Sequence, residues 1–358
     1  MNIKTTLFWA VLALFFVTAC EDDDPVGDGS EQIPSQTWTY SGLGDYRVNE
    51  VEVSGDWVYA ATQQGMFKKM LGSEDTLWTA AGLSDMEITD FAILNNERLL
   101  ASVALSESNP SATLYETNNG GSDWTAVQSD FGGQQGAVTC QALDVSPINS
   151  DIIFGRGSYN VAKSTDGGQS WTSVFADWDN IGYQADLIRV SEENPDVIWA
   201  GGETSIFSPY MVKSTDGGEN WLPVQVPSEG DNAVYAMVIN PQNSDQVLVG
   251  MEGRIIYSED AGENWEVVLS PDNYSYFHDM QGSLEEGSKV YAAGTDGGND
   301  VGDIIIYTTT DFGQSWSTIQ HAGMQGKQYA ALDLGLFSGA MEEAMYVATN
   351  HGVFIYKP

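Results

Sequence analysis

The chain has 358 residues, of which 51 are acidic and 13 basic, giving a formal net charge of −38 at pH 7. Only 18% of the residues are charged, whereas 42% are hydrophobic and 11% aromatic, so the chain can bury a large core and is not a disordered polyanion. A surface this poor in lysine and arginine argues against DNA or RNA as a partner, because binding phosphates requires positive charge.

The first residues have the features of an export signal. Lys4 precedes an apolar run from Leu7 to Ala19, which is shorter than the roughly 20 apolar residues that span a bilayer. The four residues that end at Cys20, Val-Thr-Ala-Cys, resemble the bacterial lipobox, and this resemblance implies cleavage before Cys20 and acylation of that cysteine. We therefore expect a signal peptide over residues 1–19 and a protein held at the bacterial outer membrane or cell surface by its N-terminal lipid.

Residues 20–35 are predicted to be a flexible, lipidated acidic tether, because they contain Gly, Pro, Asp and Ser with almost no large apolar side chain. The acidic run from Glu21 to Asp24 resembles the surface-export signal of Bacteroidota-type lipoproteins. A solvated tether with no such signal is the alternative. Cys140, predicted to lie in an inner strand, is left without a cysteine partner after lipidation of Cys20 and is expected to be a small buried side chain.

A repeat of about 45 residues organises the rest of the chain. Four segments align without gaps: STDGGQSW ending at Trp171, STDGGENW ending at Trp221, SEDAGENW ending at Trp265 and TTDFGQSW ending at Trp316. Degenerate copies end at Trp124, where Asn119 replaces the aspartate, and at Trp78.

These segments resemble the Asp-box, or BNR, repeat of sialidases, xyloglucanase propellers, sortilin-type receptors and photosystem II assembly propellers. In such a turn the aspartate can accept hydrogen bonds from backbone N–H groups, the glycine supplies a positive φ, and the tryptophan begins the next strand with its ring buried. The repeated residues are therefore interpreted as structural: Asp166, Trp171, Asp216, Trp221, Asp260, Trp265, Asp311 and Trp316.

The spacing of the tryptophans predicts the number of blades. From Trp38 the steps to the next six repeat tryptophans are 40, 46, 47, 50, 44 and 51 residues, and each repeat reads as four short strands with alternating apolar residues. After Trp316 the chain supplies three more strands but no further box, and residues 36–43 resemble the outer strand at residues 75–83. The prediction is an all-β, seven-bladed propeller over residues 36–358, closed by pairing of its N-terminal strand with the last three strands.

Candidate ligand-binding residues lie in the loops on the face opposite the boxes, where the resembling enzymes carry their active sites. Aromatic side chains in these loops could stack on sugar rings or contact a protein, although loop aromatics can also simply cover the blades. The candidates are Trp178, Tyr183, Phe207, Tyr210, Tyr274, Tyr276 and Tyr329.

Three classes of enzyme are the alternative to a recognition module. A sialidase-like site needs three arginines, for which Arg47, Arg156 and Arg254 are candidates, but the usual N-terminal arginine motif is absent and seven blades exceed the sialidase six. A xyloglucanase-like glycosidase needs two carboxylates, here Asp177, Asp179, Asp186 or Asp279, but only one of its two propellers is present. A polysaccharide lyase would use His278 with its neighbouring tyrosines.

Asp296, Asp300 and Asp303 lie in a glycine-rich segment that could bind Ca²⁺, but their spacing does not match the EF-hand loop, which favours a solvated acidic turn. No His and Cys cluster indicates zinc. The sequence thus favours a monomeric, lipid-anchored recognition module for a glycan or a protein, with a glycosidase or lyase as the alternative.

Overall fold

The computed structural model describes residues 37–104, 114–127, 131, 140–157, 160–176, 187–204, 208–228, 233–272, 276–295, 302–338 and 343–358. The chain divides into two units, Met1–Ser35 and Gln36–Pro358, and every named element lies in the second. The expected signal peptide (1–19), the tether (20–35) and Cys20 lie outside the described residues. No helix in the described part of the chain is long and apolar enough to cross a membrane.

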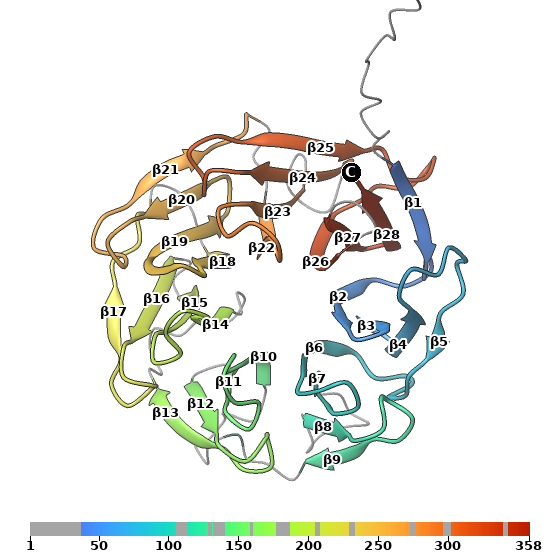
Figure 1. The fold of residues 1–358 in the computed structure, drawn as a ribbon, viewed down its shortest axis with the longest axis horizontal. Coiled ribbons are helices and arrows are strands. Elements are labelled where there is room, and N and C mark those ends of the chain that lie inside the picture. Colours follow the sequence, from blue (N-terminus) through green and yellow to red (C-terminus); the bar gives the residue numbers. More distant parts are fainter. Residues whose placement is uncertain are drawn as a thin grey trace, which may run out of the picture. The chain divides into compact units, whose positions relative to one another are not determined.

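Within residues 37–358, seven four-stranded antiparallel sheets surround a central axis (Figure 1), which confirms the predicted seven-bladed propeller. We number the sheets as blades 1 to 7 along the chain. Blade 1 contains β2 (Val48–Ser54), β3 (Trp57–Thr62), β4 (Gly65–Met70) and β5 (Thr79–Ala80). Blade 2 contains β6 (Ile88–Ile93), β7 (Leu99–Val103), β8 (Leu114–Thr117) and β9 (Thr125–Val127).

The next two blades follow the same order. Blade 3 contains β10 (Cys140–Val145), β11 (Ile153–Gly157), β12 (Asn160–Ser164) and β13 (Thr172–Ala176). Blade 4 contains β14 (Leu187–Val190), β15 (Ile198–Glu203), β16 (Pro209–Ser214) and β17 (Leu222–Val224).

The last three blades complete the ring. Blade 5 contains β18 (Val234–Asn240), β19 (Asn243–Met251), β20 (Ile255–Ser258) and β21 (Glu266–Leu269). Blade 6 contains β22 (Tyr276–Gly282), β23 (Val290–Thr295), β24 (Ile304–Thr309) and β25 (Ser317–His321). Blade 7 contains β26 (Ala331–Ser338), β27 (Glu343–Thr349) and β28 (Gly352–Lys357), and its outer strand is β1 (Thr37–Gly42).

Ring closure occurs as predicted from the tryptophan spacing. β1 pairs antiparallel with β28, so that Thr37 faces Lys357 and Trp38 faces Tyr356. The two strands lie side by side in Figure 1. This pairing gives blade 7 its fourth strand and leaves no exposed edge on β28.

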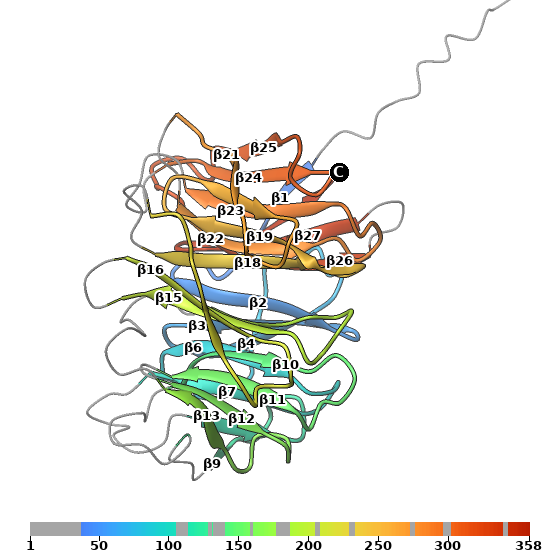
Figure 2. The same cartoon turned by 90° about the vertical axis from the view of Figure 1, so that its left-hand side faces the viewer.

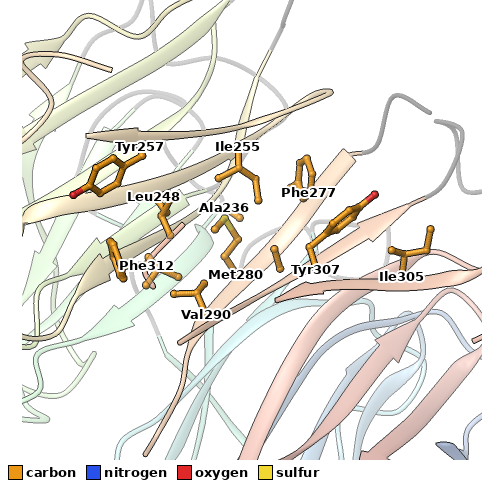
Figure 3. Packing of buried hydrophobic residues seen from close by; sticks show 12 residues of the cluster. Ala236, Leu248, Ile255, Tyr257, Phe277, Met280, Val290, Ile305, Tyr307 and Phe312 are labelled. Atoms are coloured by element: carbon orange, nitrogen blue, oxygen red, sulfur yellow. The ribbon is translucent and has the colours of Figure 1, made fainter. Parts of the chain in front are cut away.

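Apolar side chains fill the space between neighbouring blades rather than one central core. Between blades 5 and 6, for example, Leu248 and Ile255 pack with Phe277, Met280 and Tyr307 (Figure 3). The second strands of the blades, such as β7, β15 and β23, are buried on both faces because each sheet packs between two neighbouring sheets.

The molecule has two different faces (Figure 2). One, the box-turn face, carries the turns between the third and fourth strands of blades 1 to 6. The other, the channel-mouth face, carries the starts of the inner strands β2, β6, β10, β14, β18, β22 and β26.

The repeated turns on the box-turn face all have the same hydrogen bonds. In each of the four full boxes, the aspartate Oδ1 accepts the backbone N–H of the residue four positions later, at 2.8–2.9 Å. The hydroxyl of the preceding Ser or Thr donates to the same aspartate and accepts the N–H of the box glycine. The turn at Trp124 keeps this pattern, because Asn119 Oδ1 accepts the N–H of Asp123.

The hydrogen bonds lower the pKa of the box aspartates. The largest contribution comes from the side chain four residues later, Asn220 for Asp216 and Ser315 for Asp311, and each of these two aspartates has a pKa of about 2. The box aspartates are therefore ionised at all physiological pH values and act as acceptors that fold the turn.

Basic side chains join neighbouring blades on the same face. Lys68, Lys163 and Lys213 each donate from Nζ to a backbone carbonyl of the box turn in the next blade, at 2.6, 2.8 and 3.4 Å. Arg98 does the same to the carbonyl of Gly167. Each of these lysines also lies over an aromatic ring of its own blade, 4.9–5.3 Å from the ring centroid. Several of the chain's few cations are thus used to hold the ring together.

Candidate functional site

The inner strands share an irregularity at the channel mouth. In six of the seven inner strands, all except β14, the register with the second strand shifts near the start of the strand, as in a β-bulge. A bulge leaves one residue out of the ladder and changes the direction of its side chain. The residues left out, which we call the bulge residues, are Asn49, Thr89, Gln141, Tyr235, His278 and Leu332.

Four of the bulge residues line one cavity. A cavity of about 360 Å³ is bounded by Asn49, Thr89, His278 and Leu332, together with Arg47 and Glu87 at its rim. These residues come from the consecutive blades 6, 7, 1 and 2. We call this cavity the channel-mouth pocket.

The residue that follows a pocket-lining bulge residue is in each case a carboxylate that joins two blades. Glu50 accepts the backbone N–H of Phe91 at 2.7 Å, and Asp90 accepts that of Leu143 at 3.0 Å. Asp279 accepts the N–H of Leu334. The fourth of these carboxylates, that of Asp333, accepts the N–H of Val51 at 2.7 Å. Asp144, further along β10, makes the corresponding bond to Val190 in blade 4.

Arg189 of blade 4 faces this carboxylate ring. Its Nη2 lies 3.5 Å from Oδ1 of Asp279 in blade 6, so the ion pair spans blade 5. The nearby carboxylates favour its charged form and raise its pKa further. Among the described residues of the channel, Arg189 is the cation that offsets the charge of this ring.

Burial in the channel raises the pKa of the ring carboxyl groups. Removal from bulk water is the largest cause for each of them. It raises the pKa of Asp90 to about 7 and that of Asp144 to about 6. It also raises to about 8 the pKa of Glu52, which follows Glu50 by two residues in β2. The pKa values of Glu50 and Asp333 are also raised by burial, with further contributions from neighbouring carboxylates. Part of the ring is therefore protonated near neutral pH.

An aromatic cluster of blades 5 and 6 includes His278, the aromatic residue that lines the pocket. His278 stacks on Tyr276 with the ring centroids 6.0 Å apart and the planes 12° from parallel. Tyr235 of blade 5 packs against both rings, at 5.8 Å from Tyr276 and 5.9 Å from His278. All three side chains are partly exposed.

The three candidate arginines do not share a site. Arg47 is exposed at the pocket rim and donates from Nε to Asn49 Oδ1 at 3.2 Å. Arg156 is buried in blade 3, where it donates to Gln141 and lines a small cavity with Tyr210. Arg254 donates to the carbonyl of Pro227. The arrangement that a sialidase-like site requires is not formed by these residues.

The remaining predicted residues fall into three groups. Tyr329 is completely buried against Phe354 and His351. The prediction that it belongs to a ligand-stacking surface is therefore wrong, because its ring packs in the core and offers no face to a ligand. Asp279 is buried and its two oxygens are used by Arg189, Gln281 and Leu334. The residues outside the described part of the chain are Asp177, Trp178, Asp179, Tyr183, Asp186, Phe207, Tyr274, Asp296 and Asp300.

No group of three or more His, Cys, Asp and Glu side chains in the described part of the chain is arranged to hold a metal ion. Asp303, the described member of the predicted calcium site, accepts a hydrogen bond from Gln320 Nε2 at 2.8 Å.

Sequence reasoning found Arg47, Tyr276 and His278 but missed Asn49, Thr89 and Leu332. A signal for these residues is present in the inner strands. VNEV at 48–51, ITDF at 88–91, FHDM at 277–280 and ALDL at 331–334 all place one variable residue and one acid between two apolar residues. This shared pattern marks the positions as equivalent between blades, whereas the bulges themselves depend on the register between strands.

Comparisons with known proteins agree with the fold. The family model described as Sortilin-Vps10 (Sortilin, neurotensin receptor 3) matches residues 209–333. No curated protein is significantly similar in sequence.

Several solved structures share the propeller architecture. YCF48 bound to D1 peptide has a TM-score of 0.63 and 16% sequence identity, over 90% of this chain and 96% of that chain. YCF48 from Cyanidioschyzon merolae has a TM-score of 0.62 and 12% identity, over 89% of this chain and 98% of that chain. An ancestral GH74 enzyme has a TM-score of 0.56 and 19% identity, over 75% of this chain but 38% of that enzyme. At these identities the similarities show a shared fold.

Proposed function

We propose that the protein is a recognition module that binds an extended segment of a protein partner in the channel-mouth pocket. The observation that carries this proposal is the pocket itself, where one backbone irregularity presents side chains of four different types from four consecutive blades. Donors, acceptors, both signs of charge and an apolar side chain line the same cavity. A peptide backbone with its side chains can use all of them.

The similarity to YCF48, whose structure was solved with a D1 peptide, supports a peptide as the ligand. A glycan is the second class that the pocket could admit, since the rings of Tyr276 and His278 are partly exposed. The enzymatic alternative has less support, because Asp279, the described member of the candidate carboxylates, is used within the channel ring.

We further propose that the protein is anchored to the membrane through acylated Cys20. The described chain starts at Thr37, which pairs with Lys357 on the box-turn face, opposite the pocket. A tether of residues 20–35 could reach about 50 Å from that point when extended. Replacement Cys20→Ala should move the protein from the membrane to the soluble fraction, and unchanged fractionation would refute the anchor.

The binding proposal is tested with arrays of random 12-residue peptides and of glycans, probed with the detergent-solubilised full chain. Thr89→Trp and Glu87→Trp place an indole in or at the pocket, whereas Leu222→Trp adds the same ring at an exposed position of β17. The proposal expects peptides that bind the wild-type and Leu222→Trp proteins but neither pocket variant, with melting temperatures checked for all four. Pocket-dependent binding to glycans alone would overturn the peptide assignment, and binding that both pocket variants retain would overturn the site.

A further inference from the structure

The two sides of the channel-mouth pocket differ in chemistry. Asn49 and Arg47 on blade 1 form a hydrogen-bonded pair, so the guanidinium is held at the rim. On blade 6 the lining residue is His278, whose ring stacks on Tyr276 and packs against Tyr235. Glu87 on blade 2 is exposed at the rim.

The faces of aromatic rings attract cations, and the attraction grows when water is partly excluded. In the pocket, His278 is followed directly along β22 by the carboxylate of Asp279. The neighbouring strand β26 likewise places Asp333 just after the pocket-lining Leu332. A positively charged group in the pocket therefore meets the ring of His278 and the carboxylate of Glu87, and the ring carboxylates Asp279 and Asp333 directly follow two of the lining residues.

The carboxylates of the ring outnumber the positively charged side chains that face them. Arg189 is the described cation that faces them, and Asp90 is within hydrogen-bonding distance of the Glu50 carboxyl, as Asp333 is of Asp279. In such pairs one proton is shared because two adjacent ionised carboxylates repel each other. A bound cation can take over the role of the proton in these pairs.

We propose that the pocket takes a cationic side chain, lysine or arginine, from the bound segment and holds it between the ring of His278, which Tyr276 supports by stacking, and the carboxylate of Glu87. This inference rests on the recognition function proposed above and specifies its ligand. Arg47 lies on the blade 1 side, away from the aromatic cluster of blades 5 and 6, where its guanidinium is free to donate to a carbonyl of the same segment.

The test uses the peptides that bind the wild-type protein and lose binding in Thr89→Trp. Each is resynthesised with every arginine replaced by citrulline and every lysine by norleucine, which keep length and remove charge. Affinities are measured by calorimetry with the full chain at 0.15 M salt. We expect at least a tenfold loss of affinity for the neutral peptides, and about a tenfold loss for the original peptides with Glu87→Gln.

A matched variant separates a specific site from general attraction to an acidic protein. Glu219→Gln removes the same charge from an exposed position on the box-turn face, and it should leave the affinity unchanged within twofold. Equal losses for Glu87→Gln and Glu219→Gln would overturn the proposal, because the attraction would then be non-specific. Neutral peptides that bind as tightly as the originals would also overturn it while leaving the recognition function intact. If no peptide is lost in Thr89→Trp, the recognition function itself fails.

Discussion

The box-turn face and the channel-mouth face are built on the same sevenfold repeat, but they use it differently. On the box-turn face the same residues recur and make the same bonds, as the four aspartates and their Ser or Thr partners do. On the channel-mouth face the backbone bulge recurs while its residue changes from asparagine to threonine, tyrosine, histidine and leucine. Constancy at repeated positions marks structure, and variation at a repeated backbone feature gives the channel mouth its mixed chemistry, which is why the proposed ligand site lies there.

The largest loss of stability is expected from Arg189→Met. Removing one partner of a buried ion pair leaves the other charge uncompensated, and Arg189 opposes several carboxylates besides Asp279. Since 31% of its side chain remains exposed, we expect the substitution to lower the free energy of unfolding by about 2 to 3 kcal/mol, measured by urea unfolding at pH 8. The loss should shrink at pH 5, where the carboxyl groups bind protons. Arg47→Met, at the exposed rim, is the control and should change stability by less than about 0.5 kcal/mol. Equal stability of Arg189→Met and the wild type would show that the channel charges are already balanced.

The pH dependence of stability distinguishes the same two faces. The ring carboxyl groups have raised pKa values in the folded state, so between about pH 4 and pH 8 the native chain binds more protons than the unfolded chain, and its stability falls as the pH rises. The box aspartates have lowered pKa values, so their contribution is lost as the pH falls from about 4 towards 2. The titratable groups in the channel are the carboxyl groups of Glu50, Glu52, Asp90, Asp144, Asp279 and Asp333. The other charged or titratable groups nearby are Arg189 and the pocket residues Glu87, Arg47 and His278.

We therefore expect a stability maximum near pH 5 and a decrease of about 2 kcal/mol between pH 5 and pH 8, measured by urea unfolding in 0.15 M salt. In the double variant Asp90→Asn, Glu52→Gln this decrease should be smaller. A maximum at pH 8 in the wild type would contradict the raised pKa values of the ring.

On the box-turn face, Gly262→Ala tests how closely the turns pack. Gly262 has a φ of +89°, and an added Cβ would lie 2.8 Å from the Trp199 ring. Gly326 has a similar φ of +85° with nothing within 4 Å of an added Cβ. We expect Gly262→Ala to lower the free energy of unfolding by about 2 kcal/mol and Gly326→Ala by about 1 kcal/mol, measured by urea unfolding. Both substitutions strain the backbone, but only the first also creates a steric clash. Equal effects would show that the contact with Trp199 relaxes without cost.

The smallest effect is expected for the cations that join the blades. Lys213→Met keeps the aliphatic stem but removes the bond to the Ala261 carbonyl and the contact with the Trp199 ring. A loss of about 1 kcal/mol in thermal unfolding is expected. Lys357→Met, at the exposed end of β28, should leave the melting temperature unchanged. If Lys213→Met is no less stable than the control variant, apolar packing alone holds the blades together.

The sequence predicted the fold because its signals are local. The spacing of Trp78, Trp124 and the box tryptophans counts the blades, and the extra strand at residues 36–43 predicts the closure. The site was harder to predict. Tyr329 looks like its loop neighbours in sequence, but tertiary packing places its ring inside the core. The bulges at Asn49 and Thr89 depend on register between strands, which one strand's sequence does not specify.

The net charge also has a structural explanation that composition alone does not provide. Several carboxylates are acceptors for backbone N–H groups, in the box turns and between the inner strands. In the box turns these bonds stabilise the charged form of the aspartates without a cation beside them. Much of the acidic excess is therefore part of the hydrogen bonding of the fold.

The pairing of β1 with β28 has a consequence for how the chain reaches its native state. Thr37 and Lys357 are nearly the full described length apart, yet they must meet before the ring is complete. Contacts of such long sequence separation form late and slowly, because much of the chain's freedom is lost before they are made. A chain that lacks β28 has an open blade 7, so the ring closes only after β28 is available to pair with β1.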